Sequence, residues 1–326
     1  MDVELFRNTK IIEKIVLVDG LPRTGKSMIG PILASLKNVE IERIEDIFEN
    51  VLLLDYLGKL DRDAAVMLLK MEADNKFYQS LIGRNTNFRK TDHSSVFNNP
   101  HKFKYFKRLF EKEGQCVLKK INQNKNIFQA QTHNSLAMLD PCFDAFGKSV
   151  FLLEMVRNPI DLIYSWYKRG WGGNRYETDP LALTITVKTK SGNIAPWYDL
   201  LIEGNYNDLK PLDRIIEMID ALQEKSLDKY NEFDENKQSQ IHWVIFEDFV
   251  TKPDLYLKRI ETFIGTKRTR HTRKTMKKEN CPREIDFDFR KTKEHIIKEN
   301  TSLETFKKID KLYDWYHTIK KIVASY

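Results

Sequence analysis

The sequence has few cysteines and no long apolar run, and these two absences exclude several classes of protein. Cys116, Cys142 and Cys281 stand far apart among 326 residues. Cysteines so few, so far apart and odd in number exclude a disulfide framework and a cysteine-rich metal site, and they are typical of a protein in a reducing compartment. No apolar run approaches the roughly 20 residues that a membrane-spanning helix needs. Because no basic segment followed by an apolar one opens the chain, we expect no secretory signal and a cytoplasmic location.

The sequence is not poor in apolar residues, as the sequences of disordered proteins are. Hydrophobic residues make up 41% and charged residues 31% of the sequence, as in a soluble globular protein. Lysine and arginine number 54 against 47 acidic residues, so the formal charge of +7 favours anionic partners. No linker divides the sequence, and we expect a single α/β domain over residues 1–326.

Predicted strands alternate with predicted helices along the chain. Apolar and β-branched runs predict strands at 11–19, 39–44, 127–132, 150–156 and 241–246. Helical spacing predicts helices from Lys26 and at 46–82, 102–122, 159–168, 212–230, 253–264 and 301–326. This alternation is typical of a parallel sheet flanked by helices, with the almost wholly apolar strand 150–156 at its centre. Residues 169–208 are expected to be an irregular insertion on the acceptor side, and residues 266–300 a basic loop.

The loop after the first strand has the pattern of a phosphate-binding loop. Residues 20–27, Gly-Leu-Pro-Arg-Thr-Gly-Lys-Ser, fit G-x-x-x-x-G-K-[ST] in full, between a strand and a helix. Such a loop points backbone N–H groups at an anion, and the helix that follows adds its positive N-terminus. We therefore predict phosphate binding by residues of this loop: Pro22, Arg23, Thr24, Gly25, Lys26 and Ser27.

A second anion site is predicted where the strand 150–156 ends. Arg157 follows that strand, at the edge of the sheet where parallel α/β proteins bind ligands, and Ser165 lies about two turns into the next helix. The arginine provides a planar fork for a phosphate, and the serine adds a hydroxyl donor. Two anion sites on one sheet edge suit a ligand with phosphates at both ends.

Three segments resemble sulfotransferases that use 3′-phosphoadenosine-5′-phosphosulfate (PAPS). Residues 157–167, Arg-Asn-Pro through Ser-Trp-Tyr, resemble their 3′-phosphate segment, and residues 22–27 look like their 5′-phosphosulfate loop. Residues 244–265 are similar to the family's strand, Tyr-Glu-Asp turn and Phe-Leu-Gly helix. The resemblance implies a P-loop-type sulfotransferase fold and in-line sulfuryl transfer without a required metal, leaving adenosine 3′,5′-bisphosphate. It places Arg23 near the leaving oxygen, with Lys26 and Ser27 facing the 5′-phosphate.

The sequence departs from the family in two places. Lys26 stands where the family usually has threonine, which makes the loop a full Walker A pattern. The family's C-terminal Arg-Lys-Gly segment has no clear match. In its place, the basic stretch with Arg268 and Arg270 is a candidate source of cations for the 3′-phosphate.

A general base is needed to take the proton of the acceptor. His133 closes the strand 127–132 at the donor edge, and Gln131-Thr132-His133 resembles the Lys-Thr-His of the family's cytosolic branch, where the histidine is the base. Other branches use a glutamate from the strand or turn after the first helix. Glu42 and Glu45 occupy that region and are the alternative candidates.

The acceptor side is rich in aromatic residues, which suit sugar rings or flat acceptors. These residues are Trp166, Trp171, Tyr176, Trp197, Tyr198 and Tyr206. We expect a hydroxyl, or less readily an amine, of a carbohydrate or small molecule as the acceptor. The basic segment 102–120 is an alternative attraction for an anionic glycan, a lipid headgroup or nucleic acid, so peripheral membrane contact stays open.

Two other functions compete with sulfuryl transfer. Lys26, with Glu247-Asp248 after the last strand as metal ligands, fits an ATP- and Mg²⁺-dependent kinase, but Arg157 stands where a kinase would need an acid. A nucleic-acid-binding protein would use the basic patches and leave Arg157 and Ser165 unexplained. Because no recognition helix, zinc spacing or RNA-binding signature accompanies these patches, we expect no nucleic acid partner.

Overall fold

A five-stranded parallel sheet forms the centre of the computed structural model, which describes residues 3–189, 192–202 and 208–326. The strand order is β2-β3-β1-β4-β7, and every neighbouring pair is parallel. The strands are β1 (Ile15–Asp19), β2 (Arg43–Ile44), β3 (Phe128–Gln131), β4 (Val150–Val156) and β7 (Ile241–Ile245). The predicted α/β class with a parallel sheet is confirmed. The central strand is β1, whereas β4 lies beside it, because β7 pairs with the outer side of β4.

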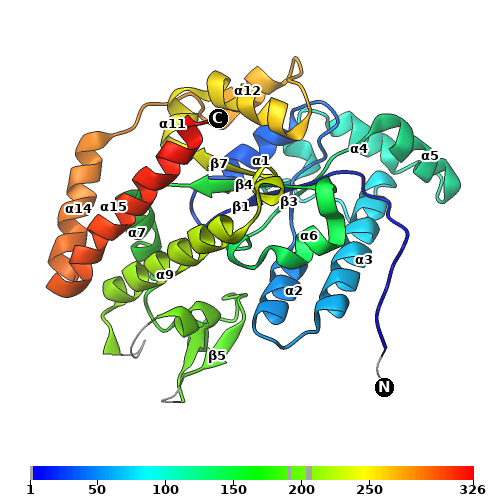
Figure 1. Cartoon of the computed structure of the whole chain (residues 1–326). Coiled ribbons are helices and arrows are strands. Elements are labelled where there is room, and N and C mark those ends of the chain that lie inside the picture. Colours follow the sequence, from blue (N-terminus) through cyan, green and yellow to red (C-terminus); the bar gives the residue numbers. More distant parts are fainter. Residues whose placement is uncertain (1–2, 190–191, 203–207) are drawn as a thin grey trace.

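Helices connect the strands and cover both faces of the sheet (Figure 1). In the first half they are α1 (Lys26–Ala34), α2 (Asp46–Tyr56), α3 (Arg62–Leu81), α4 (Lys102–Arg108), α5 (Gln115–Asn124), α6 (Asp140–Phe146) and α7 (Pro159–Tyr167). In the second half they are α8 (Arg175–Thr178), α9 (Pro211–Glu232), α10 (Glu235–Gln238), α11 (Phe246–Thr251), α12 (Pro253–Ile264), α13 (Thr272–Lys278), α14 (Phe287–Asn300) and α15 (Leu303–Ala324). In the described part of the chain, none of the helices is both long and apolar enough to cross a membrane.

Side chains of β3 alternate between the two helical layers, as a strand requires. The Phe128 ring packs edge-on against Phe48 of α2 and Phe77 of α3. The next residue, Gln129, points the other way and donates a hydrogen bond from Nε2 to the Gly30 carbonyl of α1 at 3.1 Å. The sheet is therefore buried on both faces, and its carboxyl edge is the part left for ligands.

Two predicted helices are each divided in two, and a glycine with a positive φ lies within each break. The predicted helix 46–82 ends at Tyr56 and restarts at Arg62, because Gly58 adopts a φ of 63° and terminates the first helix. The predicted helix 102–122 is interrupted between α4 and α5, where Gly114 has a φ of 80°. Both predictions of one continuous helix were wrong.

Other segments differ from their predictions in extent. The predicted strand 39–44 is reduced to β2 and a single bridge between Val39 and Ile127. Residues 266–300, expected to be a basic loop, contain α13 and α14, the latter capped by the Asp286 carboxylate, which accepts the Phe289 N–H at 2.8 Å. The insertion 169–208 contains α8 and the antiparallel pair β5 (Thr186–Lys188) and β6 (Ile194–Pro196). Tyr206 lies outside the described residues.

A buried ion cluster ties α4 to the edge of the sheet. The Glu40 carboxylate is 1% exposed and accepts hydrogen bonds from Lys104 Nζ at 2.8 Å and from two nitrogens of Arg108 at 2.7 and 2.9 Å. Burial raises the pKa of Glu40, but the charges of Lys104 and Arg108 outweigh it and hold that pKa well below its usual value. The cluster holds α4 in place by charge, in addition to the apolar packing of Tyr105 against Ile41 and Val96.

We predict that Glu40→Ala lowers the free energy of unfolding by about 3 kcal/mol, because it leaves buried Arg108 and half-buried Lys104 without their counter-charge. Urea unfolding measures the change. The matched control is Glu111→Ala. It removes the partner of Lys120 from an ion pair that is more exposed than the Glu40 cluster, and it should lower the free energy of unfolding by less than about 1 kcal/mol.

The same cluster gives this prediction a pH dependence. A carboxyl whose pKa is depressed in the folded state stabilises the protein above its unfolded pKa, near 4.3, and loses that contribution as the pH falls. The stability gap between wild type and Glu40→Ala should therefore narrow below about pH 4. A stability gap that stays constant down to pH 3 would contradict this role of Glu40. So would equal losses of unfolding free energy in Glu40→Ala and Glu111→Ala.

Candidate functional site

The phosphate loop is shaped by two glycines that no other residue can replace without displacement. Gly20 has a φ of 118°, and a Cβ there would overlap the backbone carbonyl of Met155 on β4. Gly25 has a φ of 106°, and a Cβ there would overlap the ring of Phe246. The loop therefore lies directly on β4 and on the start of α11, which fixes it at the carboxyl edge of the sheet.

The loop carries its strain at Arg23. This residue has a φ of 75°, in the left-handed region that a side chain disfavours by about 1 kcal/mol. Inside the turn, Thr24 is buried and its hydroxyl donates to the Leu21 carbonyl at 2.8 Å. The helix α1 starts at Lys26, so the first N–H groups of this helix have no partner within it. Exposed Ser27 lies in that first turn, where an anion would meet N–H groups and a hydroxyl together.

Lys26 lies beneath the loop, where it is 3% exposed. Its ammonium donates to the carbonyls of Gly20 and Leu21. Burial lowers the pKa of Lys26 to about 8, although Asp19 and Glu49 oppose this shift. The carboxyl groups of Asp19 and Glu154 come from paired positions of β1 and β4, and burial, followed by the charge of Asp19, raises the pKa of Glu154. The lysine therefore stands over buried acids, and among them Asp19 is the main source of the negative charge that opposes the fall in its pKa.

The two predicted anion sites are brought together by the structure. Arg157, at the end of β4, donates from Nη1 to the backbone carbonyl of Arg23 at 2.9 Å. The Arg23 guanidinium donates from Nε to the Ser165 hydroxyl on α7 at 3.2 Å. The Nε of Arg157 is buried and has no hydrogen-bond partner among the described residues. This nitrogen lies next to the phosphate loop and is a donor that an anion in the site would satisfy.

Further cations surround this junction, and one of them comes from the segment 266–300. The guanidinium of Arg283 lies 5.0 Å from the centre of the Phe246 ring and that of Arg157 lies 5.2 Å from the same centre. Burial lowers the pKa of Arg157, the charges of Asp161 and Glu247 oppose this shift, and those of Arg283 and Arg290 add to it. Burial also lowers the pKa of Arg23, and the charges of Arg157 and of exposed Arg169 lower it further. The site therefore carries several positive charges in close proximity.

Arg268 and Arg270, the predicted cations for the second phosphate, have other contacts. Arg268 forms ion pairs with Asp254 and Glu261 of α12, the latter at 2.9 Å. Arg270 contacts the ring of His271 at 3.3 Å. This stretch lies beside the far end of α1, and α13 then returns along α1 toward the loop. The return of α13 explains why Arg283, which the sequence interpretation did not single out, lies beside Arg157.

His133 directly follows Thr132 at the end of β3 and pairs with a carboxylate that the sequence interpretation missed. Its Nδ1 lies 2.8 Å from Oε1 of Glu49 on α2. Burial and the charge of Lys26 lower the pKa of His133, so the imidazole is neutral at pH 7. Burial also raises the pKa of Glu49 to about 8, with Asp19 and Asp46 adding to the shift and Lys26 opposing it. A neutral imidazole oriented by an acid is the arrangement that a general base requires.

Glu42 and Glu45, the alternative bases, line a different cavity, of about 580 Å³. The Glu42 carboxyl packs over Gly30 of α1, and burial raises its pKa to about 7. Glu45 forms ion pairs with Arg43 at 2.6 Å and with Lys76 at 3.0 Å. Neither carboxyl lines the cavity that contains His133, whereas Glu49, one turn after Glu45 on α2, does.

A cavity of about 330 Å³ opens between His133 and the insertion. Pro22 of the phosphate loop lines it, and the Pro22 carbonyl accepts the indole N–H of Trp166 at 2.8 Å. Its aromatic walls are Trp166, Trp171, Tyr176, Trp197 and Tyr198. The hydroxyl groups of Tyr176 and Tyr198 lie 2.5 Å apart. The cavity is large enough for a small organic ligand and joins the loop to the candidate base.

The acidic pair after β7 is engaged in structural contacts. Glu247 accepts the Asn158 N–H at 3.0 Å and the Tyr316 hydroxyl at 2.9 Å. Asp248 accepts the Tyr256 hydroxyl at 3.2 Å. Over residues 3–189, 192–202 and 208–326, no group of three histidine, cysteine or acidic side chains is arranged to hold a metal.

Comparison with known proteins finds similarity in structure alone. No protein-family model and no curated protein sequence matches the chain. A sulfotransferase domain from the curacin biosynthetic pathway is 12% identical, with 81% of this chain and 77% of that chain covered and a TM-score of 0.44. A sulfotransferase domain from the Synechococcus PCC 7002 olefin synthase is 14% identical, with 82% and 78% covered and a TM-score of 0.42. A sulfotransferase from Mycobacterium tuberculosis H37Rv is 11% identical, with 86% and 76% covered and a TM-score of 0.41. At these values the likeness concerns the general course of the chain and bears on neither donor nor acceptor.

Proposed function

We propose that this chain is a sulfotransferase that moves the sulfuryl group of PAPS to a hydroxyl of a small molecule or carbohydrate. One observation carries the proposal. The phosphate loop and the end of β4 form one cationic site, in which Arg157 donates to the Arg23 carbonyl and Arg23 donates to Ser165. A nucleotide with phosphates on both the 5′ and 3′ positions uses both halves of such a site, whereas a 5′-triphosphate leaves the Arg157 half unused.

The donor supplies a sulfuryl group on the 5′-phosphate, and the residues of the site have separate roles. The N–H groups of the loop, together with Lys26 and Ser27, hold the 5′-phosphate. Arg157, Ser165 and Arg283 hold the 3′-phosphate. Arg23 stands between the two sites and stabilises the negative charge that grows on the bridging oxygen as the sulfur–oxygen bond breaks. The new bond forms between the acceptor oxygen and sulfur, and adenosine 3′,5′-bisphosphate leaves.

His133 takes the proton of the acceptor hydroxyl in this proposal. With Glu49 ionised, the Nδ1–H of His133 donates to Glu49 Oε1, and Nε2 keeps its lone pair for the acceptor proton. Glu49 is therefore a positioning residue, because it acts through the imidazole. The cavity lined by Trp171 and Trp197 holds the acceptor, since it opens on His133 and on Pro22 of the donor loop.

Two features of the strand ends weigh against a kinase with the same phosphate loop. A kinase of this type holds Mg²⁺ with an acid at the end of a strand near the loop. β4 is followed by Arg157 and β3 by Thr132-His133, so no acid follows either neighbour of β1. The acid within β4, Glu154, is buried beside Lys26. The carboxylate of Glu247 after β7 is engaged by Asn158 and Tyr316.

We predict that Arg157→Ala and Arg283→Ala each weaken binding of adenosine 3′,5′-bisphosphate by about thirtyfold, since a hydrogen bond to a charged group is worth ~2 kcal/mol. Binding of adenosine 5′-monophosphate should change by less than about threefold, because the 3′-phosphate is absent. Isothermal titration calorimetry measures both affinities.

Two variants serve as controls for this assignment. Lys26→Ala should weaken both nucleotides, because both carry the 5′-phosphate. Arg268→Ala should weaken neither, because its guanidinium is paired with α12. Equal losses for the two nucleotides in Arg157→Ala would remove the 3′-phosphate role from Arg157.

We predict that His133→Ala slows release of adenosine 3′,5′-bisphosphate from PAPS, with a phenol as acceptor, by at least about a hundredfold. Donor affinity should be unchanged. In wild type, kcat should rise with pH as Glu49, whose pKa is raised to about 8, loses its proton. Glu49→Gln should abolish this acidic limb and leave a low, flat rate. A near-normal rate in His133→Ala would move the base to another residue.

A further inference from the structure

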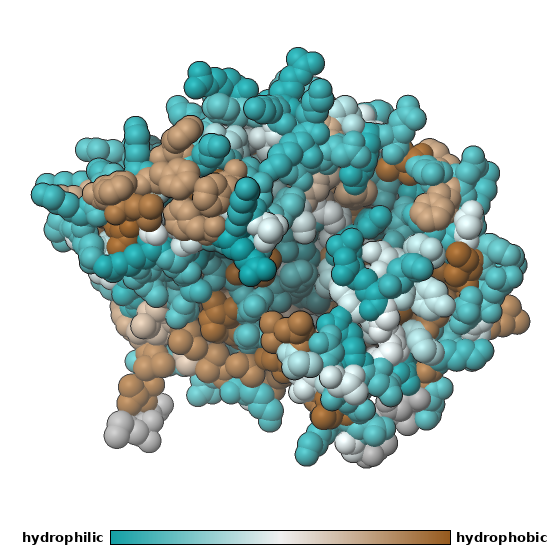
Figure 2. Space-filling model, turned by 180° about the vertical axis from the view of Figure 1, so that it is seen from behind, coloured by the Kyte–Doolittle hydropathy of each residue, from teal (hydrophilic) through white to brown (hydrophobic). Residues whose placement is uncertain are grey.

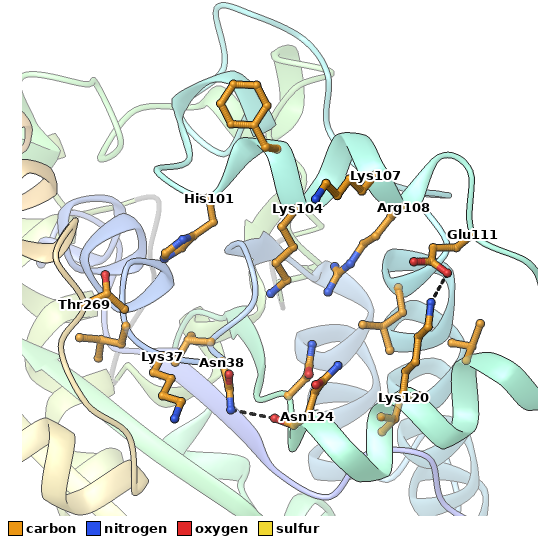
Figure 3. Close-up of a pocket in the computed structure, with 17 residues that line it drawn as sticks. Lys37, Asn38, His101, Lys104, Lys107, Arg108, Glu111, Lys120, Asn124 and Thr269 are labelled. Atoms are coloured by element: carbon orange, nitrogen blue, oxygen red, sulfur yellow. Dashed lines mark hydrogen bonds and ion pairs between the residues drawn. The ribbon is translucent and has the colours of Figure 1, made fainter.

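A second cavity, of about 590 Å³, opens between α4, α5 and the last turn of α1. Its charged lining is mainly cationic: Lys37, Lys104, Lys107, Arg108 and Lys120, with Glu111 as the acid. Its uncharged polar residues include His101, whose pKa is lowered by burial, Asn38, Asn124, Asn126 and Thr269. Figure 3 shows Lys104 and Arg108 pointing from α4 into the cavity, with Lys120 on the opposite side and His101 and Thr269 at one end. The cavity is separate from the cleft of the phosphate loop, which lies at the other end of α1.

The cavity keeps a positive charge after its ion pairs are counted. Glu40 is the counter-charge for Lys104 and Arg108, and Glu111 is the counter-charge for Lys120. Five cations therefore meet two carboxylates, and Lys37 and Lys107 are exposed. Such a cavity favours an anion. The fork of Arg108 is already bonded to Glu40, so the exposed ammonium groups of Lys37 and Lys107 are the groups left for a phosphate.

The rest of the lining is apolar, which a free phosphate would not require. It comprises Leu36, Val39, Leu81, Phe103, Val117 and Ile121. A phosphate bound here would lie against hydrocarbon side chains. The combination suits a phosphate ester that carries an apolar group.

The outer surface of the same region is apolar as well as basic. The exposed fractions of Phe103, Leu109 and Phe110 are 71%, 50% and 88%. Exposed Lys107 and Lys112 stand between and beside them. In Figure 2 a patch of apolar side chains lies among hydrophilic ones at the left margin, the side of the molecule where α4 and α5 lie. Exposed aromatic residues interleaved with lysines are typical of surfaces that enter the headgroup layer of a membrane.

We propose that this docking surface, formed by α4, α5 and the residues between them, binds an anionic phospholipid bilayer, with one lipid phosphate in the cavity. Phe103, Leu109 and Phe110 enter the interface, and the lysines face the anionic headgroups. The occupant is a lipid and not a soluble polyanion, because a polyanion would leave the three apolar side chains in water. A second copy of the chain fits less well, since a symmetric contact would set the same lysines against one another.

Docking by this surface leaves the donor site open to solution. The cavity lies at the carboxyl end of α1, and the phosphate loop lies at the amino end, nine residues or about 13 Å away along the helix. Nucleotide exchange at the loop is therefore compatible with binding to a bilayer. The inference does not depend on the identity of the donor.

Co-sedimentation of the full chain with vesicles tests the proposal. The vesicles contain phosphatidylcholine alone or phosphatidylcholine with phosphatidylglycerol. We expect binding to the anionic vesicles and not to the neutral ones. Lys107→Glu should weaken binding by about twentyfold, because it exchanges an attraction for a repulsion near the surface. Joint Phe103→Ser and Phe110→Ser should weaken it by about tenfold or more through the loss of apolar insertion.

Matched surface variants control for general effects of charge and polarity. Lys321→Glu and Leu303→Ser replace exposed residues of α15, away from the docking surface, and should bind as wild type does. Circular dichroism and thermal unfolding should be the same for all variants, since every replaced side chain is exposed.

Four results would overturn the proposal. The first is no binding to anionic vesicles, or equal binding to both kinds. The second is complete release of the protein from anionic vesicles by glycerol 1-phosphate, which would assign the cavity to a small soluble phosphate. The third is heparin binding that survives the phenylalanine replacements while vesicle binding is absent. The fourth is a dimer in sedimentation that Phe103→Ser dissociates.

Discussion

The site depends on the contact between the phosphate loop and the end of β4. Gly20 and Gly25 let the loop lie against Met155 and Phe246, and Arg157 then donates to the Arg23 carbonyl. This hydrogen bond joins a turn near the N-terminus to a strand more than a hundred residues later. Because the parallel sheet sets β1 beside β4, the turn and the arginine meet at one edge without any further device.

Lys26 is surrounded by buried charged groups, and their electrostatic balance also affects His133 and Glu49. Lys26 lies over Asp19 and Glu154, and the same lysine acts on His133 and Glu49. A buried ammonium needs counter-charge, and Asp19 provides most of it before any anion binds. An incoming phosphate therefore changes the electrostatic environment of the imidazole as well as that of the lysine. In the proposed mechanism, donor binding and base strength are therefore linked through Lys26.

The sequence predicted the elements whose pattern is local and missed those that depend on long-range contacts. The loop of residues 20–27, Arg157 and Ser165 carry short motifs, and the parallel sheet follows from the alternation of strands and helices. Glu49 has no motif of its own, and its role is visible once α2 sets it against His133. Arg283 is one of many basic residues in 266–300, and the return of α13 along α1 distinguishes it from Arg268. The helix breaks near Gly58 and Gly114 were missed because a single glycine within a run of helix-forming residues does not by itself mark where a helix ends.

Calorimetry of the wild-type protein with two nucleotides tests the central claim most directly. One titration uses adenosine 3′,5′-bisphosphate, and the other uses ATP with an excess of Mg²⁺. A site that holds phosphates at both ends of a nucleotide predicts that the bisphosphate binds at least about tenfold more tightly. Equal affinities, or a preference for the magnesium complex of ATP, would contradict the account.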